Sequence, residues 1–506
     1  MAGIHDAPDA SAPPAGLDPN AIGFVDSVAI GLNATSPAYS LAAVIGPIAA
    51  FVGVNVPGVM LASFVPMLLI ASAFYYLNRA DPDCGTTFSW VSRALGPTTG
   101  WMGGWAIAMT GVLVIGSLSE VGVQFTLLAI GLDGWASDAW ILRSLTVLVI
   151  LLMSLLCVRS TQTSARLQNV LTLLQVAGLL VFVAVALYRV YAGTGSLDSV
   201  RPSADWLNPF GAGGAPLTAG LLLGVFVFWG WESAVNLTEE TGGASTAPGL
   251  AGIWATVILL VTYVSVAFAV IAYCGPAFLG DHADDEEAVF ATLSTEVLGG
   301  WDWVVLLAVA TSALASTQTT IIPASRTALS MARRRALPTA FGRIHPRHRT
   351  PDIATWWVSA IAVVWYLVMH WLSENALADS LTALSLLIAF YYALTGLACA
   401  VHHRHLLTTG VRNLFLLGVG PLVGAAMLCW LLVESVRDMA DPANSYSGVS
   451  WFGLGPPLVI ALFLTLCGVV LMLLWRQVSP RFWKDRLPTS VDHPATPPTA
   501  RDQESV

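Results

Sequence analysis

A carboxylate and a hydroxyl interrupt one long apolar stretch of the chain at Glu232 and Ser233, two residues after Gly230. A carboxylate at membrane depth costs roughly 2.5 to 3.5 kcal/mol on insertion scales, so it normally faces a cavity or a partner. There it can bind an amine or carry a proton, since burial favours the neutral form of a carboxyl group. The alternative is a helix kinked for packing, with Glu232 bonded to a neighbouring helix.

A second interruption lies in the first apolar stretch, where the chain reads GLNATSP from Gly31 to Pro37. Proline removes a backbone donor and clashes with the preceding turn of a helix. Half-helices that end inside a membrane expose amides and carbonyls, which can bind a substrate and a coupling ion. Ordinary kinks at Pro37 and Gly230 are the simpler alternative, because such kinks are frequent in membrane helices.

Composition places these groups in a membrane. The 506 residues are 56% hydrophobic and only 10% charged, with a mean hydropathy of +0.72, whereas soluble domains have about 25% charged residues. Residues 1 to 20 lack the basic and apolar regions of a signal peptide, so the first apolar stretch is expected to stay in the membrane. We therefore expect an all-α integral membrane protein that crosses the membrane many times.

Twelve apolar stretches are long enough to cross about 30 Å of hydrocarbon. The tails at 1–20 and 481–506 are too poor in apolar residues to fold alone, so we expect both to be disordered around a transmembrane domain of residues 21–480. The expected spans are 28–52, 56–78, 100–131, 139–158, 168–190, 216–238, 251–274, 301–332, 354–372, 378–402, 412–434 and 453–476.

Charge patterning predicts the orientation. With a cytoplasmic N-terminus, all but four of the 22 Lys and Arg residues fall on the inside, the exceptions being Arg143, Arg189, Arg201 and Arg437. Cytoplasmic loops are enriched in Lys and Arg. We therefore expect a multi-pass protein of the cell membrane with both termini in the cytoplasm.

The two interruptions lie five spans apart, in the first and sixth spans. Because the offset of five spans is odd, the first and sixth spans cross the membrane in opposite directions. An inverted repeat of five plus five helices requires this arrangement. The repeats are expected at about 21–190 and 210–405, with two extra helices at about 410–478.

Four blocks of sequence resemble bacterial amino-acid permeases of the amino acid–polyamine–organocation superfamily, and the likeness covers about Phe24 to Pro480. The blocks are GLNATSPAY at 31–39, GTTFSWVSRALGP at 85–97, WGWESAVNLTEE at 229–240 and ASRTALSMAR at 324–333. The resemblance implies a leucine-transporter-like fold. Substrate is then held between the broken first and sixth spans, flanked by the third, eighth and tenth.

The same resemblance implies the substrate-binding residues, which are Thr35, Ser36, Ala38, Tyr39, Trp229, Gly230, Trp231, Glu232 and Ser233. In the family the first-span break is usually Gly-Ser-Gly, whose amides bind a carboxylate. Here the aligned residues are Thr35, Ser36 and Pro37, and Pro37 has no amide hydrogen. Binding of a substrate carboxylate therefore depends on the amides and hydroxyls of Thr35, Ser36 and Ala38.

Four further residues are candidates for ion coupling or for supporting the site. Some proton-coupled relatives carry a fifth-span lysine in the place of a sodium ion, and the matching residue here is Gln175, which cannot titrate. Glu120 could pair with a proton or an ammonium group, or bond two helices together. Ser312 and Ser316 could present hydroxyls to a cation, or could let helices approach closely.

These features predict a secondary active transporter that works by alternating access, moving an amino acid with proton coupling or by exchange. An amine or polyamine carrier of the same fold is the alternative. A membrane enzyme or channel is a poorer match, because no nucleophile cluster or filter repeat is visible. Six scattered cysteines and no nucleic-acid motif indicate no metal, cofactor or nucleic-acid partner. The expected partners are a small substrate, a proton or sodium ion, and lipid.

Overall fold

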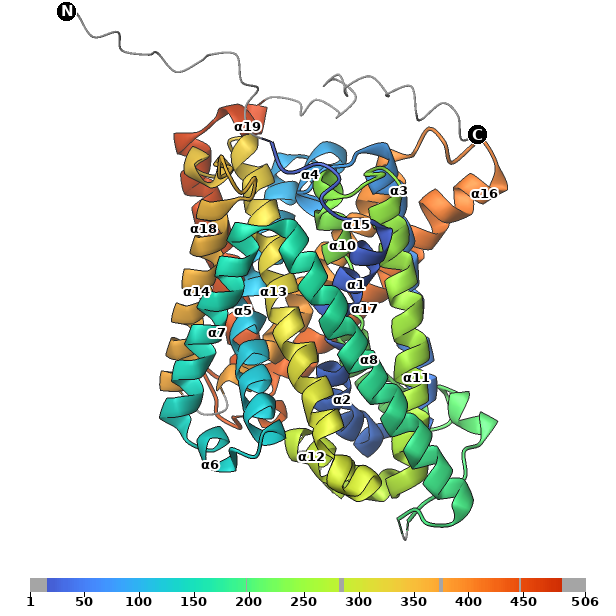
Figure 1. Ribbon diagram of the computed structural model, residues 1–506. Coiled ribbons are helices and arrows are strands. Elements are labelled where there is room, and N and C mark those ends of the chain that lie inside the picture. Colours follow the sequence, from blue (N-terminus) through green and yellow to red (C-terminus); the bar gives the residue numbers. More distant parts are fainter. Residues whose placement is uncertain (1–15, 197, 282–285, 373–375, 446, 485–506) are drawn as a thin grey trace, which may run out of the picture.

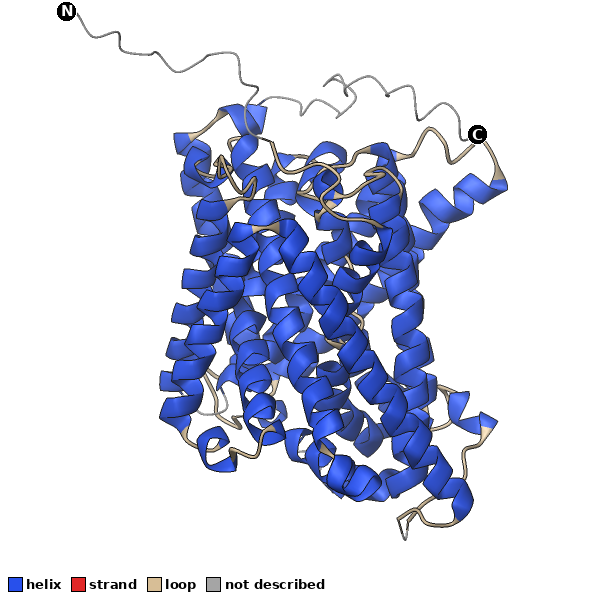
Figure 2. Cartoon of the chain, in the orientation of Figure 1, coloured by secondary structure: helices blue, strands red, loops and turns tan. Residues whose placement is uncertain are grey.

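The computed structural model describes residues 16–196, 198–281, 286–372, 376–445 and 447–484 and is built of helices (Figure 1). Within these ranges there is no β-strand, and the only bridges pair Ile22 with Thr241 and Trp451 with Leu454 (Figure 2). Satisfying backbone groups within each segment is what lets a helix cross a bilayer. The all-α prediction is confirmed.

Ten helical segments in the described part of the chain are long and apolar enough to cross a membrane. The first of them, Phe24–Ala80, contains three helices, α1 (Phe24–Thr35), α2 (Pro37–Val52) and α3 (Val56–Ala80). The sixth predicted span is divided into helices too short to count. The integral membrane class is therefore confirmed, and the total of twelve spans stays a prediction.

The remaining helices that matter for the site follow the predicted spans in order. They are α5 (Pro97–Ala129), α7 (Ala139–Arg159), α8 (Thr161–Ala192), α9 (Gly214–Phe226), α10 (Ser233–Asn236), α11 (Ala247–Asp281), α13 (Trp303–Arg333), α14 (Asp352–Leu372), α15 (Ala376–His402), α17 (Gly420–Ala440) and α18 (Pro456–Val478).

Two of these helices, α5 and α13, form the centre of the bundle. In the most apolar window of each, 89% of α5 and 83% of α13 is buried, against 28% of α8 and 33% of α18. Small residues bring the two central helices together: a Cβ on Gly122 would lie 2.8 Å from the Leu314 side chain. The third and eighth predicted spans thus lie inside the bundle, and α8 and α18 present much more of their surface to the outside.

Both ends of the described chain pack on one end of the bundle. Leu17 is buried in a cluster with Cys84, and the Phe482 ring of the short helix α19 (Arg481–Lys484) stacks on Phe88 at 5.8 Å. Arg349 donates to the carbonyls of Gly16 and Leu17 and to Asp18. We call this end, formed by residues 16–22, 81–96, 334–351 and 479–484, the terminal face (Figure 1, top).

The predicted tails extend beyond these contacts. Of the N-terminal tail expected at 1–20, residues 16–20 are described and held as above, and of the C-terminal tail expected at 481–506, residues 481–484 form α19. Residues 1–15 and 485–506 lie outside the described part. The domain boundaries and the two repeats stay predictions.

Close packing between α8 and α13 leads to a test of this fold. A Cβ on Gly178 would lie 2.7 Å from Ala308 Cβ and 3.1 Å from the Val304 carbonyl. Overpacking of this kind costs typically 1 to 3 kcal/mol. Gly178→Ala should therefore lower the thermal unfolding midpoint in detergent. Gly134→Ala, where a Cβ meets nothing within 4 Å, is the control; equal midpoints for the two variants would contradict the helix contact.

Candidate functional site

The first predicted break falls on a single residue. Ser36 has left-handed backbone angles, with φ 52° and ψ 59°, and it separates α1 from α2. Pro37 is the first residue of α2, a position that favours proline because no amide donor is needed there. The proline therefore starts a new helix, and the chain changes direction at Ser36.

The second break spans residues 227–232, between α9 and α10, where the backbone forms successive turns. Gly230 has φ 118°, which side-chain-bearing residues rarely adopt. A Cβ at this position would lie 2.4 Å from the Ala34 carbonyl oxygen and 3.0 Å from the Thr35 amide nitrogen. The two breaks, almost two hundred residues apart in sequence, therefore touch, and only glycine permits the contact.

Neighbouring helices satisfy the carbonyls that the breaks leave without helical partners. The Ser316 hydroxyl from α13 donates to the Ala34 carbonyl at 3.1 Å, and the Tyr263 hydroxyl from α11 donates to the Val227 carbonyl at 2.7 Å. All of these groups are in the buried interior. An unpaired buried carbonyl is costly, so these hydroxyls stabilise the broken geometry.

The start of α2 is held by Ser312 of α13. The Ser312 hydroxyl accepts a hydrogen bond from the Ala38 amide at 3.3 Å and lies 3.1 Å from the Ser36 hydroxyl. Pro37 contributes no donor. Two of the groups that the sequence offers to a carboxylate, the Ala38 amide and the Ser36 hydroxyl, are therefore already engaged by one serine, through bonds long enough to exchange for a stronger acceptor.

Glu232 is the buried acid of the site, with 5% of its surface exposed. Its Oε1 accepts a hydrogen bond from the Tyr391 hydroxyl, and its Oε2 accepts from the Tyr392 hydroxyl and from the Gly230 amide at 3.1 Å. The Trp229 indole donates in turn to the Tyr391 oxygen. Carboxylate and tyrosines thus tie the second break to α15.

Neither Tyr391 nor Tyr392 was among the site residues predicted from the sequence. The available signal was two adjacent tyrosines midway along an apolar span, which is weak on its own because their partner lies 160 residues away. Their contact with Glu232 makes α15 part of the site, as expected for the tenth span.

A cavity adjoins Glu232 between α5, α13, α15 and the two breaks. Four of the nine predicted substrate residues line it, namely Trp229, Gly230, Glu232 and Ser233. The other lining residues come from the end of α1 and from the three helices, and they are Ala34, Ile107, Thr110, Gly111, Thr320, Pro323 and Tyr391. The cavity wall is mainly apolar, with one carboxylate and a few hydroxyls.

The other five predicted residues surround this cavity without lining it. Thr35, Ser36 and Ala38 form the first break, and the Tyr39 hydroxyl lies 3.2 Å from the Ser117 hydroxyl of α5. Trp231 is fully buried, with its ring edge-on to Phe74 at 5.1 Å. A substrate-binding role for each of the nine stays a prediction.

The candidates for coupling are divided between two places. Ser312, Ser316 and Gln175 lie at the first break, where Gln175 donates to the Asn33 side chain. Glu120 is not among the cavity residues; it pairs with His370 at 2.9 Å, two residues from the end of α14. The structure therefore brings together three of the four and places the fourth in a separate pair.

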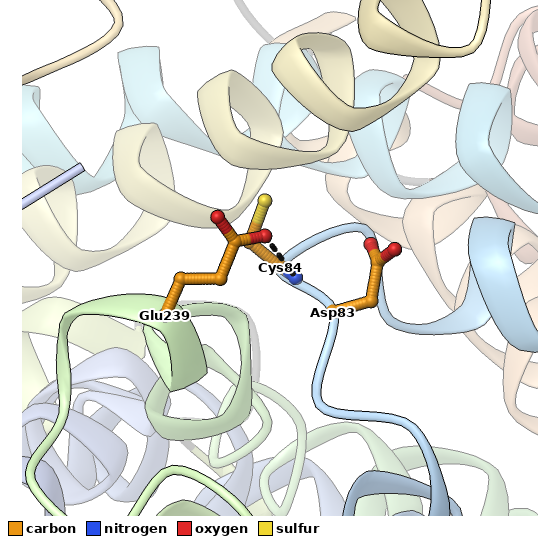
Figure 3. Close-up of side chains that lie close together, drawn as sticks. All are labelled: Asp83, Cys84 and Glu239. Atoms are coloured by element: carbon orange, nitrogen blue, oxygen red, sulfur yellow. Dashed lines mark hydrogen bonds between the residues drawn. The ribbon is translucent and has the colours of Figure 1, made fainter. Parts of the chain in front are cut away.

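One group of side chains in the described part of the chain has the spacing of metal ligands. Asp83, Cys84 and Glu239 hold their ligand atoms within 4.8 Å of one another at the terminal face (Figure 3). Glu239, however, accepts from Arg333 at 2.8 Å, and Asp83 forms an ion pair with Arg334.

Electrostatics at this cluster do not fit a cation. Burial raises the pKa of the Cys84 thiol well above its ordinary value, so the neutral thiol is favoured. Both carboxylates are already neutralised by arginines. Deeper in the bundle Arg326 and Glu240 form a two-bond ion pair with 1% and 0% of their side chains exposed. We interpret the cluster as part of an ion-pair network that joins the connection before α4 (Thr87–Leu95) to α13.

Two touching helix breaks beside a small cavity define the class of protein, a membrane transporter of the broken-helix type. The chain belongs to the amino acid permease family, since the family model of that description matches residues 22–476.

Relatives agree with this assignment. An uncharacterized transporter of Mycobacterium tuberculosis is 29% identical over 67% of this chain and 72% of its own length. The low-affinity putrescine importer of Escherichia coli is 23% identical over 79% of this chain and 84% of its own. The branched-chain amino acid permease of Lactococcus lactis is 24% identical over 61% and 68%. The family and these relatives are transporters.

Contact between the breaks can be tested at Gly230. Gly230→Ala adds a Cβ against the Ala34 carbonyl and strains the backbone, so the breaks must separate. Binding of any ligand at the cavity should weaken at least tenfold, measured as ligand-induced thermal stabilisation. Gly131→Ala is matched in its positive φ of 75° but has nothing within 4 Å of the new Cβ; if it weakens binding as much, strain in general and not this contact is responsible.

The ion pairs at the terminal face predict a pH dependence. Burial would raise the pKa of Asp83, but Arg334 and hydrogen bonds from Ser89, Gly85 and Ser330 outweigh it and hold that pKa below its ordinary value. A carboxyl group with a lowered folded pKa stabilises the protein above its unfolded pKa of about 3.9, and this is lost as pH falls through the folded value.

Asp83→Asn should therefore lower the unfolding midpoint near pH 7, because hydrogen bonds to a charged group contribute about 1.5 to 3 kcal/mol. The difference from the parent should be constant down to about pH 4 and shrink below it. Thermal unfolding in detergent across this range measures it, with the exposed Asp133→Asn as control. A difference that vanishes already at pH 6 would contradict the lowered pKa of Asp83.

Proposed function

We propose that this protein is a secondary active transporter that moves an amino acid across the cell membrane by alternating access. The observation that carries the proposal is the contact of two helix breaks at a small cavity that is lined by one buried carboxylate, Glu232. Breaks of this kind place free backbone groups at the depth where transporters bind their substrates. Movement of one group of helices against the other opens the cavity to each side in turn.

Recognition is assigned to the two breaks. The substrate ammonium group lies near Glu232 and the hydroxyls of Tyr391 and Tyr392, and the carboxylate takes the place of the Ser312 hydroxyl at the Ala38 amide. A charged hydrogen bond is about twice as strong as a neutral one, which favours this exchange. The apolar wall formed by Ile107 and Pro323 suits an uncharged side chain.

An amine or polyamine substrate is the second candidate. Two observations favour it: the missing donor at Pro37 and the occupied amide of Ala38 weaken the carboxylate subsite, and one relative is a putrescine importer. A cationic amine has no carboxylate, so Glu232 would be enough to bind it and the carboxylate subsite would not be needed. The branched-chain permease among the relatives supports the amino acid instead.

Proton coupling or exchange is proposed over sodium coupling. Gln175 cannot titrate, and its amide is bonded to Asn33. Of the two carboxylates that the sequence offers for coupling, Glu232 lines the cavity, whereas Glu120 already has His370 as a partner. Glu232 is then the proton-binding group. No enzymatic step, cofactor or nucleic acid is part of the proposal.

The cell membrane and cytoplasmic termini are proposed from the distribution of Arg and Lys. Arg333, Arg334, Arg343 and Arg349 all belong to the terminal face or its border, which would then lie inside. The inverted repeats at about 21–190 and 210–405 are proposed from the two breaks.

A thermal-shift screen of the purified protein tests the function. Proteinogenic amino acids and their decarboxylated amines are compared with and without sodium and at two pH values. A ligand at a hundredfold excess over its Kd stabilises the folded state by about 2.7 kcal/mol. An amino acid that shifts the midpoint when its amine does not supports the proposal, amines alone support the second candidate, and no shift with either contradicts both.

Glu232→Gln separates the two candidates further. An amide in place of the carboxylate removes the charge that an ammonium group faces, so a cationic amine should lose far more than tenfold in affinity, and a zwitterionic amino acid about tenfold. Ligand-induced stabilisation and uptake into proteoliposomes measure the change. Undiminished affinity for either ligand would remove Glu232 from the binding site.

A further inference from the structure

We propose that Gln168 is a positioning residue: its side-chain amide joins the end of α1 to α13 and so holds the first break in its binding geometry. The proposal rests on the proposed transport function and adds a residue outside the cavity to it. Gln168 lies on α8, has no exposed surface, and is not among the residues that the sequence indicated.

Every polar atom of the Gln168 side chain is used. Its Nε2 donates to the Ala315 carbonyl at 3.1 Å and to Gln318 Oε1 at 2.6 Å, both on α13. Its Oε1 accepts from Asn33 Nδ2 of α1 at 2.5 Å. One side chain therefore bonds two other helices in opposite directions, with the donors toward α13 and the acceptor toward α1.

Asn33 completes the connection on the α1 side. Its Nδ2 also donates to the Gln168 carbonyl at 2.8 Å, and its Oδ1 accepts from the Thr172 hydroxyl at 2.9 Å and from Gln175. Asn33 is itself bonded to the break, since its carbonyl accepts from the Ser36 amide at 3.0 Å. The residue that Gln168 holds is thus in the last turn before the change of direction.

On the α13 side the connection reaches the same break again. Ala315 directly precedes Ser316, whose hydroxyl bonds the Ala34 carbonyl. The Gln318 side-chain amide in turn donates to the Ser164 hydroxyl of α8 at 3.0 Å. This series of hydrogen bonds therefore begins and ends on α8. The end of α1 is consequently fixed to α8 and α13 by neutral groups alone.

Neutral amides suit a junction that must also open. Each bond has a defined donor and acceptor, so the buried chain fits one arrangement of the three helices. It carries no net charge, so separation of α1 from α13 exposes no ion to the membrane interior. Alternating access requires such movement near the breaks, and Gln168 is the residue whose bonds to α1 and α13 would break together.

Two substitutions test the proposal. Gln168→Leu removes the amide at similar volume, and Gln168→Glu keeps the shape but places a carboxylate against two acceptors, the Ala315 carbonyl and Gln318 Oε1. Protonation of that Glu restores one donor. Gln162→Leu, an exposed glutamine on the same helix, is the matched control.

Uptake kinetics are the first measurement, with the substrate that the thermal-shift screen identifies. Gln168→Leu should raise KM at least tenfold over Gln162→Leu, with maximal rate per folded protein changed less than KM. For Gln168→Glu the KM, divided by that of the parent at each pH, should fall as pH is lowered. A role in packing alone would lower the unfolding midpoint and leave both KM values unchanged.

Hydrogen–deuterium exchange of residues 24–36 is the second measurement, and it needs no substrate. Gln168→Leu should speed exchange in this segment at least tenfold, whereas Gln162→Leu should not. Unchanged exchange would overturn the proposal, and so would faster exchange with an unchanged KM. If no ligand is found for the parent, the proposed transport function fails, while the exchange result still decides whether Gln168 holds α1.

Discussion

The contact between Gly230 and the Ala34 carbonyl is the constraint on which the rest of the site depends. It brings two helix breaks from distant parts of the sequence to one point, at the cost of a glycine in a conformation that other residues avoid. Once they meet there, the ends of four half-helices surround one cavity. Glu232 and Ser36 each lie two residues from this close approach.

Polar chemistry differs between the two breaks and the terminal face. Around the breaks, backbone groups are satisfied by hydroxyls and amides such as Ser316, Tyr263 and Gln168, and the carboxylate of Glu232 is covered by tyrosines. Arginine pairs occur toward the terminal face, as for Asp83 with Arg334. Neutral hydrogen bonds exchange partners at lower cost than buried ions do, so the part proposed to bind substrate is also the part best able to rearrange.

Local chemistry made the breaks predictable from sequence, because Pro37 and Gly230 each act through the backbone of their own segment. Composition was likewise sufficient for the membrane class. The pairs that hold the site were not predictable: Tyr392 with Glu232, His370 with Glu120, and Gln168 with Asn33 join residues more than a hundred positions apart. Nothing in the neighbourhood of Gln168 in the sequence distinguishes it from Gln175, which the family resemblance singled out instead.

Leu17 and Phe482 pack on the same end of the bundle, beside Cys84 and Phe88. If the described chain begins and ends on the same side of a membrane, the number of times that it crosses the membrane is even. An even number of crossings agrees with the predicted total of twelve, which stays a prediction. The two ends of the described chain are therefore neighbours in space although they are separated by the whole transmembrane domain in sequence.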